Sequence, residues 1–334
     1  MTKLSWPDRR VMELLRLEHP IVLSPMAGIG TVELAASVCA AGGLGSIGCA
    51  GMQAAEARET LAALRSLASS PINVNFFCHA PARRDPALER AWRDRLTPYY
   101  REFGLDPTLA PAAIEFPSFD HDLCAVVEDA RPEVVSFHFG LPEPQLVARV
   151  KAAGCRVMST ATTVAEARWL EERGADVIIA QGSEAGGHRG TFLLAEANGM
   201  SAQTGVFALL ARIVGAVSVP VIAAGGIGDA RGITAAFALG PDSTVVTNVF
   251  TGRPARGLVN RFVREMGPLA DAIPAFPLPL AALAPIRAKA QERNDSDFTP
   301  FWAGQATVPL RELSARDLTE SLASESLARF RQLA

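Results

Sequence analysis

The chain lacks the cysteine and hydrophobic patterns of several common protein classes. Its five cysteines are scattered: Cys39, Cys49, Cys78, Cys124 and Cys155. They form no C-x-x-C pair, which argues against a disulfide framework and a bound metal and fits a reducing compartment. No apolar run approaches the roughly 20 residues that span a bilayer, and residues 1–20 carry charged side chains where a signal peptide has an apolar core. We therefore expect a cytoplasmic protein with no membrane partner.

The chain also lacks a strong net charge and several nucleotide and hydrolase motifs. A formal charge of −3 over 334 residues gives no reason to expect a nucleic-acid partner. No Gly-x-Ser-x-Gly or Gly-x-x-x-x-Gly-Lys-Ser/Thr motif is present, which argues against common hydrolases and P-loop NTPases. No Gly-x-Gly-x-x-Gly unit opens a separate dinucleotide-binding domain. What is abundant is apolar sequence, at 49% hydrophobic residues, enough for one large core or two modest ones.

Short apolar runs alternate with helix-like patterns from residue 21 onward. The predicted strands are residues 21–27, 44–49, 72–77, 134–140, 156–161, 177–182, 219–225 and 244–250. Strands that alternate with helices imply right-handed crossovers and a parallel sheet. Eight such units predict an α/β fold of the (β/α)₈ TIM-barrel type. A doubly wound open sheet remains an alternative, because periodicity does not show whether the sheet closes.

Two segments interrupt this alternation. Residues 79–129 are rich in charge and proline and contain a helical pattern, so we expect a helical excursion from the barrel. After residue 252 proline and alanine dominate, followed by helical patterns at 280–292 and 315–333. The sequence therefore predicts a barrel over 1–255, with the excursion at 79–129, and a C-terminal helical lobe over 256–334 packed on it.

The predicted strands end in small or polar residues. Met26 and Ala27 end the first strand, Asn75 lies in the third and Gln181 ends the sixth. Small residues at a barrel mouth leave room for a flat ligand, and the two amides offer hydrogen bonds to a heteroaromatic edge. Glycines 225–228, with Gly225 and Gly226 first, precede a predicted helix and could hold a phosphate through backbone N–H groups. Taken alone, such a glycine run is as often an ordinary βα turn.

One strand end carries a histidine on a glycine loop. After the apolar run 177–180 come Glu184-Ala185-Gly186-Gly187-His188. Adjacent glycines allow close approach to a ligand, and histidine is the side chain whose ordinary pKa lies near neutrality. His138 ends another strand, where a buried core histidine and a functional one are about equally expected. Arg253 and Arg256 follow the last strand and could face a phosphate or be ordinary surface charge.

Several of these motifs resemble those of one enzyme family. They are Ser24-Pro25-Met26-Ala27, Ala41-Gly42-Gly43-Leu44-Gly45, Asn75-Phe76-Phe77, Gln181-Gly182-x-Glu184-Ala185-Gly186-Gly187-His188 and Ala223-Ala224-Gly225-Gly226-Ile227. Together they resemble the nitronate monooxygenase (2-nitropropane dioxygenase) family. Val135-Ser136-Phe137-His138-Phe139-Gly140 and Phe301-Trp302-Ala303-Gly304-Gln305 are similar to its bacterial FMN-dependent branch.

The resemblance implies FMN as cofactor and an alkyl nitronate, such as propionate 3-nitronate, as substrate. The products would be a carbonyl compound and nitrite, with O₂ as co-substrate; a homodimer is left open. His188 would be the catalytic histidine, as base or as stabiliser of the nitronate charge, and His138 would bind substrate. The resemblance implies that Asn75, Gln181, Gly186 and Gly225 contact the cofactor, and from the strand ends and glycine loops we also expect Met26, Ala27, Gly187 and Gly226 to bind it.

The chain departs from the family at the eighth strand. Gly240 is followed almost at once by Thr244-Val245-Val246-Thr247-Asn248, without the family's glycine at the phosphate. If this run is strand eight, Thr247 and Asn248 are expected to bind the phosphate instead. Two other functions stay open: an NAD(P)H:quinone or enoyl-thioester reductase on the same barrel, and a barrel that binds ligand without turnover because strand eight is altered.

Overall fold

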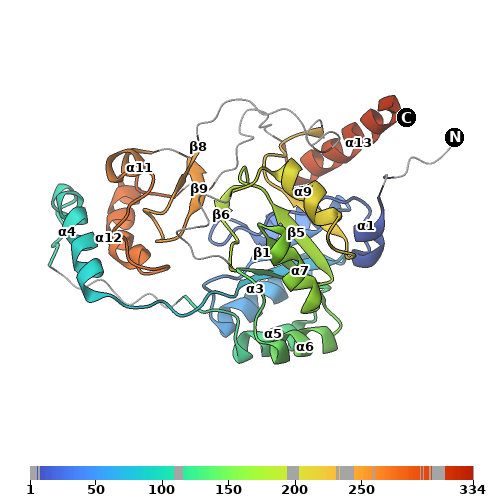
Figure 1. Cartoon of the computed structure of the whole chain (residues 1–334), viewed down its shortest axis with the longest axis horizontal. Helices are drawn as coiled ribbons and strands as arrows, with labels where there is room; N and C mark the ends of the chain where they lie inside the picture. The colour runs from blue at the N-terminus through green and yellow to red at the C-terminus, as the bar shows by residue number, and fades with distance from the viewer. Residues whose placement is uncertain are drawn as a thin grey trace.

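A six-stranded parallel sheet forms the centre of the molecule (Figure 1). The computed structural model describes residues 6, 8–108, 116–193, 203–230, 233, 244–258, 260–293, 295, 297–300, 302 and 313–333. Within the sheet the order is β1 (Gly45–Gly48), β2 (Ile72–Phe77), β3 (Val134–His138), β4 (Arg156–Ala161), β5 (Val177–Gln181) and β7 (Val221–Ala224). Every neighbouring pair is parallel. The predicted α/β class and parallel sheet are confirmed, and the sheet curls as part of a barrel.

Helices cover the outer face of the sheet. They are α2 (Val32–Ala40), α3 (Ala54–Leu67), α5 (His121–Ala130), α6 (Pro144–Ala152), α7 (Val164–Glu172) and α9 (Val206–Val214). In α3, Ala57, Leu61 and Leu64 recur at helical spacing and are buried against the sheet. On the N-terminal side, α1 (Arg10–Leu15) packs its Leu15 with Leu44 and Val177 at the amino ends of the strands.

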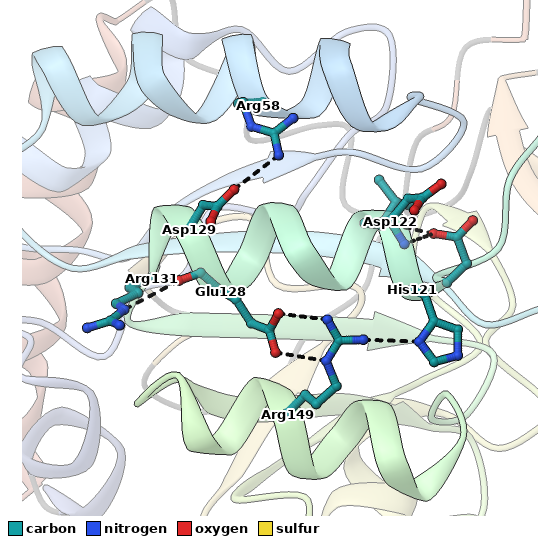
Figure 2. A network of polar contacts seen from close by, with 9 residues as sticks. Arg58, His121, Asp122, Glu128, Asp129, Arg131 and Arg149 are labelled. Carbon is teal, nitrogen blue, oxygen red and sulfur yellow. Dashed lines mark hydrogen bonds and ion pairs between the residues drawn. The ribbon is translucent and has the colours of Figure 1, made fainter.

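A polar network joins three of these helices on their solvent side (Figure 2). Arg149 of α6 donates to both carboxylate oxygens of Glu128 on α5, at 2.8 and 2.7 Å, and its third nitrogen lies 3.0 Å from His121 Nδ1. Arg58 of α3 pairs with Asp129 at 3.1 Å. Because these side chains are between about one third and two thirds exposed, the pairs add little stability.

The first predicted strand is reduced to a single parallel bridge. Val22 pairs with Leu44, and the Leu23 N–H donates to the Leu44 carbonyl at 3.0 Å. The segment therefore pairs at Leu44, the residue directly before β1. Proline at position 25 has no N–H to extend the ladder.

The prediction that residues 244–250 close the barrel is wrong. Residues Thr244–Thr247 form β8, which pairs antiparallel with β9 (Ala255–Leu258) in a second sheet that also contains β6 (Gly187–His188). Residues 248–254 connect β8 to β9, and a connection this short costs little conformational entropy to close. Pairing of β8 with β9 is therefore favoured over pairing of β8 with a strand of the main sheet. All four residues of β7 are accordingly half-buried, whereas all four of β1 are buried. An eight-stranded closed barrel is not seen in the described residues.

A second hydrophobic core lies beside the barrel, at the left of Figure 1. It joins α4 (Pro86–Glu102) to α11 (Arg261–Met266) and α12 (Pro279–Glu292). The Tyr100 hydroxyl of α4 donates to the Ala282 carbonyl at 2.7 Å. The predicted excursion thus packs with the C-terminal helices, while the domain boundary at 255 stays a prediction.

The last helix, α13 (Ala315–Leu333), returns to the barrel and packs on α2. Across the described ranges, none of the helices combines the length and apolar character needed to cross a bilayer.

Candidate active site

His188 lies where the two sheets meet. On one side β6 pairs with β9, with His188 opposite Ala255 and the Arg189 N–H donating to the Pro254 carbonyl at 3.1 Å. On the other side the His188 carbonyl accepts from Gln181 Nε2 at 2.8 Å and from His138 Nε2 at 3.0 Å. The main chain at His188 is therefore held by the carboxyl ends of β3 and β5 and by the second sheet.

Gln181 binds the loop at two points. Its Oε1 accepts from the Gly190 N–H at 2.8 Å, and its carbonyl accepts from the Arg189 guanidinium. A Cβ at Gly190 would lie 2.7 Å from Thr160 Cγ2 and 2.8 Å from His138 Cε1, so only glycine fits there. Both ends of the amide thus contact protein, and flavin contact by Gln181 stays a prediction.

Two buried carboxylates hold the segments on either side of His188. Both oxygens of Glu184 accept from the Val206 N–H at the start of α9, at 3.0 and 2.8 Å. Glu166 is fully buried; it accepts from the Thr162 N–H at 2.7 Å and from the Phe192 N–H at 2.8 Å. Sequence reasoning missed Glu166, although Thr163-x-x-Glu166 is a capping-box pattern and Thr163 caps α7.

The tautomer of His188 follows from its contact with Thr251, which the sequence analysis did not single out. The Thr251 hydroxyl donates its one hydrogen to the Arg253 carbonyl at 3.1 Å. Its oxygen therefore accepts from His188 Nε2–H at 3.2 Å, which leaves a lone pair on Nδ1. Burial, followed by the neighbouring His138 and then by the positive charge of Arg253, lowers the pKa of His188 to about 3. The ring is neutral at physiological pH.

His138 uses both ring nitrogens within the protein. Nε2–H donates to the His188 carbonyl, and Nδ1, at 3.1 Å, accepts from the Thr160 hydroxyl. Burial lowers the pKa of His138 to about 4. In this arrangement the ring positions the His188 main chain, and contact of His138 with substrate stays a prediction.

Aromatic rings surround His188. Ring centroids lie 5.3 Å away for Trp302, 5.5 Å for Phe276, 5.9 Å for Phe77 and 6.2 Å for Phe139. A third histidine belongs to this group: His79 is buried, its ring centroid is 5.1 Å from that of Phe276, and burial lowers its pKa. Apart from its histidines, the group consists of aromatic rings, which suit an alkyl chain.

The small residues predicted at the strand ends lie close together. A Cβ at Gly48 would meet the Ala27 nitrogen at 2.7 Å, and one at Gly225 would meet the Ala185 nitrogen at 2.7 Å. Met26 is half-buried, while Ala27 and Gly186 are exposed. Asn75, deeper on β2, is buried and donates through Nδ2 to the Ser136 hydroxyl at 3.0 Å.

Thr247 and Asn248 lie in the second sheet and the turn after it. The Thr247 hydroxyl accepts from the Val249 N–H at 3.2 Å. Asn248 pairs through both ends of its amide with the main chain of Ala270, at 2.9 and 2.8 Å. Both side chains thus serve local structure, and phosphate binding by them stays a prediction.

A hollow of about 680 Å³ lies at the opposite end of the sheet. Its lining includes Arg10, Arg156 and Asp176, at the amino ends of the strands. Because α/β barrels carry their chemistry at the carboxyl ends of the strands, the group around His188 is the better candidate.

The chain matches a known family along most of its length. The profile of the family described as "Nitronate monooxygenase" matches residues 8–243 and 241–325, two segments that meet just before β8. A nitronate monooxygenase of Pseudomonas aeruginosa is 40% identical over 349 residues, covering 95% of this chain and 98% of that protein. This alignment is longer than the 334-residue chain, so it includes positions that the chain lacks.

Solved structures show the same likeness. A nitroalkane oxidase from Streptomyces ansochromogenes superposes with a TM-score of 0.85 and 35% identity, over 97% of this chain and all of that one. FabK from Thermotoga maritima superposes with a TM-score of 0.69 and 27% identity, over 97% of each chain. Similarity is thus greater to the nitroalkane oxidase than to FabK.

Proposed function

Because the chain belongs to the nitronate monooxygenase family, we propose that it oxidises alkyl nitronates with O₂ to a carbonyl compound and nitrite, using FMN. The observation that most supports this function is the state and position of His188. It is a neutral histidine with a lone pair on Nδ1, and it lies among aromatic rings at the carboxyl ends of the strands. Propionate 3-nitronate is one substrate of this class. When bound, the flavin supplies the electron transfer that the side chains around His188 cannot perform.

The residues at the strand ends fit a flat ring system. Gly28 and Gly187 have φ of +77° and +75°, and a Cβ at either would find no atom within 4 Å, so space is open beside them. We propose that Met26, Ala27, Gly186 and Gly187 lie against the ring, with Asn75 and Gln181 at its polar edge.

The phosphate is proposed to bind at residues 225–228. Gly225 and Gly226 have φ of +120° and +68°, and directly after the loop the Ile233 N–H donates to the Asp229 carbonyl at 2.9 Å, a hydrogen bond of helical spacing. Backbone N–H groups at such a turn bind phosphate. Thr247 and Asn248 remain proposed phosphate-binding residues. We expect them to contribute less than the 225–228 loop, because their side chains already bind Val249 and Ala270.

The low pKa of His188 favours nitronates over neutral nitroalkanes as substrates. A base with a pKa of about 3 has little driving force to remove a proton from carbon. A nitronate has already lost that proton. The site is therefore better suited to bind and orient an anion than to generate one.

The purified protein tests this function directly. We expect it to be yellow or to become so with FMN, and mass spectrometry of the heat-released cofactor should identify FMN. Turnover of ethylnitronate by the protein should consume O₂ and release nitrite. NADH should not reduce the flavin rapidly, so the flavin absorbance should not bleach. Rapid bleaching by NADH with a quinone or enoyl thioester as acceptor would favour the reductase alternative. A colourless protein that FMN cannot reconstitute would favour a barrel without turnover.

A further inference from the structure

Arg253 places a cation against the rings of the site. Its guanidinium carbon lies 3.7 Å from the centroid of the Phe139 ring, and one side-chain N–H donates to the Thr191 carbonyl. The Phe139 ring in turn lies 4.5 Å from the ring of His138 and 6.2 Å from that of His188, between centroids. The turn that carries Arg253 also carries Thr251, the partner of His188 Nε2.

The positive charge of Arg253 acts on all three histidines of the site. It lowers the pKa of His79, His138 and His188, alongside the larger effect of burial. The histidines are therefore neutral and cannot balance a negative charge on a ligand. Arg189, the other arginine acting on His138, donates to the Gln181 carbonyl at the end of β5.

An anion that enters such a site needs a compensating charge. Moving an anion out of water is costly unless it is paired and hydrogen-bonded. A guanidinium offers a planar set of N–H donors that match two oxygens of an anionic group. Contact with Thr191 and Phe139 fixes the orientation of this guanidinium.

We propose that Arg253 binds anionic oxygens of the substrate and thereby selects nitronate anions over neutral nitroalkanes. The inference rests on the proposed function, because it assigns a specificity residue to the same reaction. Arg253 would be the charge partner of the substrate, while His188 stays uncharged.

Three variants test the assignment by comparing charged and neutral substrates. Arg253→Met should lower kcat/KM for ethylnitronate by about 10- to 100-fold, as expected for loss of a charge-assisted hydrogen bond. It should change kcat/KM for freshly dissolved neutral nitroethane by less than about threefold. Arg253→Lys, which keeps the charge, should recover part of the loss. Arg149→Met removes an arginine from the outer network of Figure 2 and should leave both values unchanged.

A second substrate distinguishes which anionic group Arg253 binds. Propionate 3-nitronate carries a carboxylate as well as the nitronate. Equal losses on it and on ethylnitronate would assign Arg253 to the nitronate oxygens; a much larger loss on propionate 3-nitronate would assign it to the carboxylate. An equal loss on neutral nitroethane, or no loss on either anion, would overturn the proposal.

A binding measurement separates this inference from the proposed function. Ethylnitronate is titrated under argon into the flavin-loaded wild type and Arg253→Met, and the histidine ring signals are followed by NMR. Arg253→Met should raise Kd at least about 10-fold and raise the pKa of His138 and His188. Unchanged Kd and histidine titration would overturn the proposal. Tight binding by the wild type without turnover would instead contradict the proposed function and leave the role of Arg253 intact.

Discussion

His188 shows how much of a residue's chemistry depends on contacts far away in the chain. Its place after a strand and two glycines is readable from the sequence, as is its candidacy for proton transfer. Its tautomer is not, because the assigning hydroxyl belongs to Thr251, 63 residues further on. Nor is its low pKa, which arises from burial among rings contributed by β2, by the residue directly after β3 and by the C-terminal part of the chain.

Substitution of His188 should separate the two roles first considered for it. With Nε2–H bound to Thr251, the free lone pair on Nδ1 can accept a proton but cannot donate to a nitronate oxygen. Because a base with a pKa of about 3 removes a proton from carbon poorly, His188→Asn should lower kcat/KM for neutral nitroethane by less than the roughly 10²-fold that an effective general base supplies. For ethylnitronate the loss in kcat/KM should stay below about 10-fold, which is the loss expected when one ordinary hydrogen bond is removed.

The pH dependence provides the matching check. Because the pKa of His188 is lowered to about 3, the ring stays neutral and the wild-type kcat/KM for ethylnitronate should be flat from about pH 5.5 to 8. Stopped-flow mixing from an alkaline nitronate stock keeps the substrate anionic during the measurement. A larger loss on ethylnitronate than on nitroethane, or a fall in rate near pH 6.5, would mean that the ring acts as a charged or neutral donor.

At the scale of elements, hydrogen bonds to the neighbouring helices hold the glycine loop that carries His188 in place. Glu184 connects the loop to the N-terminus of α9, and Glu166 connects the following segment to the start of α7. A carboxylate at a helix N-terminus also interacts favourably with the helix dipole. Glu184, the acidic residue of the Glu-Ala-Gly-Gly-His motif, therefore ties the loop that carries His188 to α9.

Glu171 provides a matched control for Glu184. Each carboxylate accepts main-chain N–H groups from a neighbouring segment, Glu184 from Val206 and Glu171 from Ser218 at 2.6 Å and Val219 at 3.1 Å. Glu184→Ala and Glu171→Ala should each cost about 0.5–2 kcal/mol of stability, measured by urea unfolding. Only Glu184→Ala should also lower turnover of ethylnitronate, by a factor below about 10 as for His188→Asn, because a displaced loop misorients His188. Equal turnover in the two variants would show that the loop keeps its shape without Glu184.

At the scale of the whole molecule, the sequence predicts the individual strands and helices better than the way the sheet closes. Alternation of apolar runs and helical patterns predicted the parallel strands of the main sheet, because each strand and helix carries its own periodicity. The pairing of β8 with β9 was missed, since the same Thr-Val-Val-Thr run fits either sheet. The second core was also missed in part: α4 packs with α12 through contacts such as Tyr100 to Ala282, 182 residues apart, which no local pattern reveals.

The open edge of β7 leads to a prediction for the intact molecule. In the described residues β7 is hydrogen-bonded to β5 and ends the sheet, and its four residues are half-buried. An edge strand opens locally at lower free energy than a central one. Amide hydrogen exchange of the FMN-loaded protein should therefore be at least about 10-fold faster in β7 than in β3, which is flanked on both sides by β2 and β4. β3 serves as the internal control for global unfolding. Equal protection of the two strands would mean that another part of the chain pairs with β7 in solution and completes the barrel.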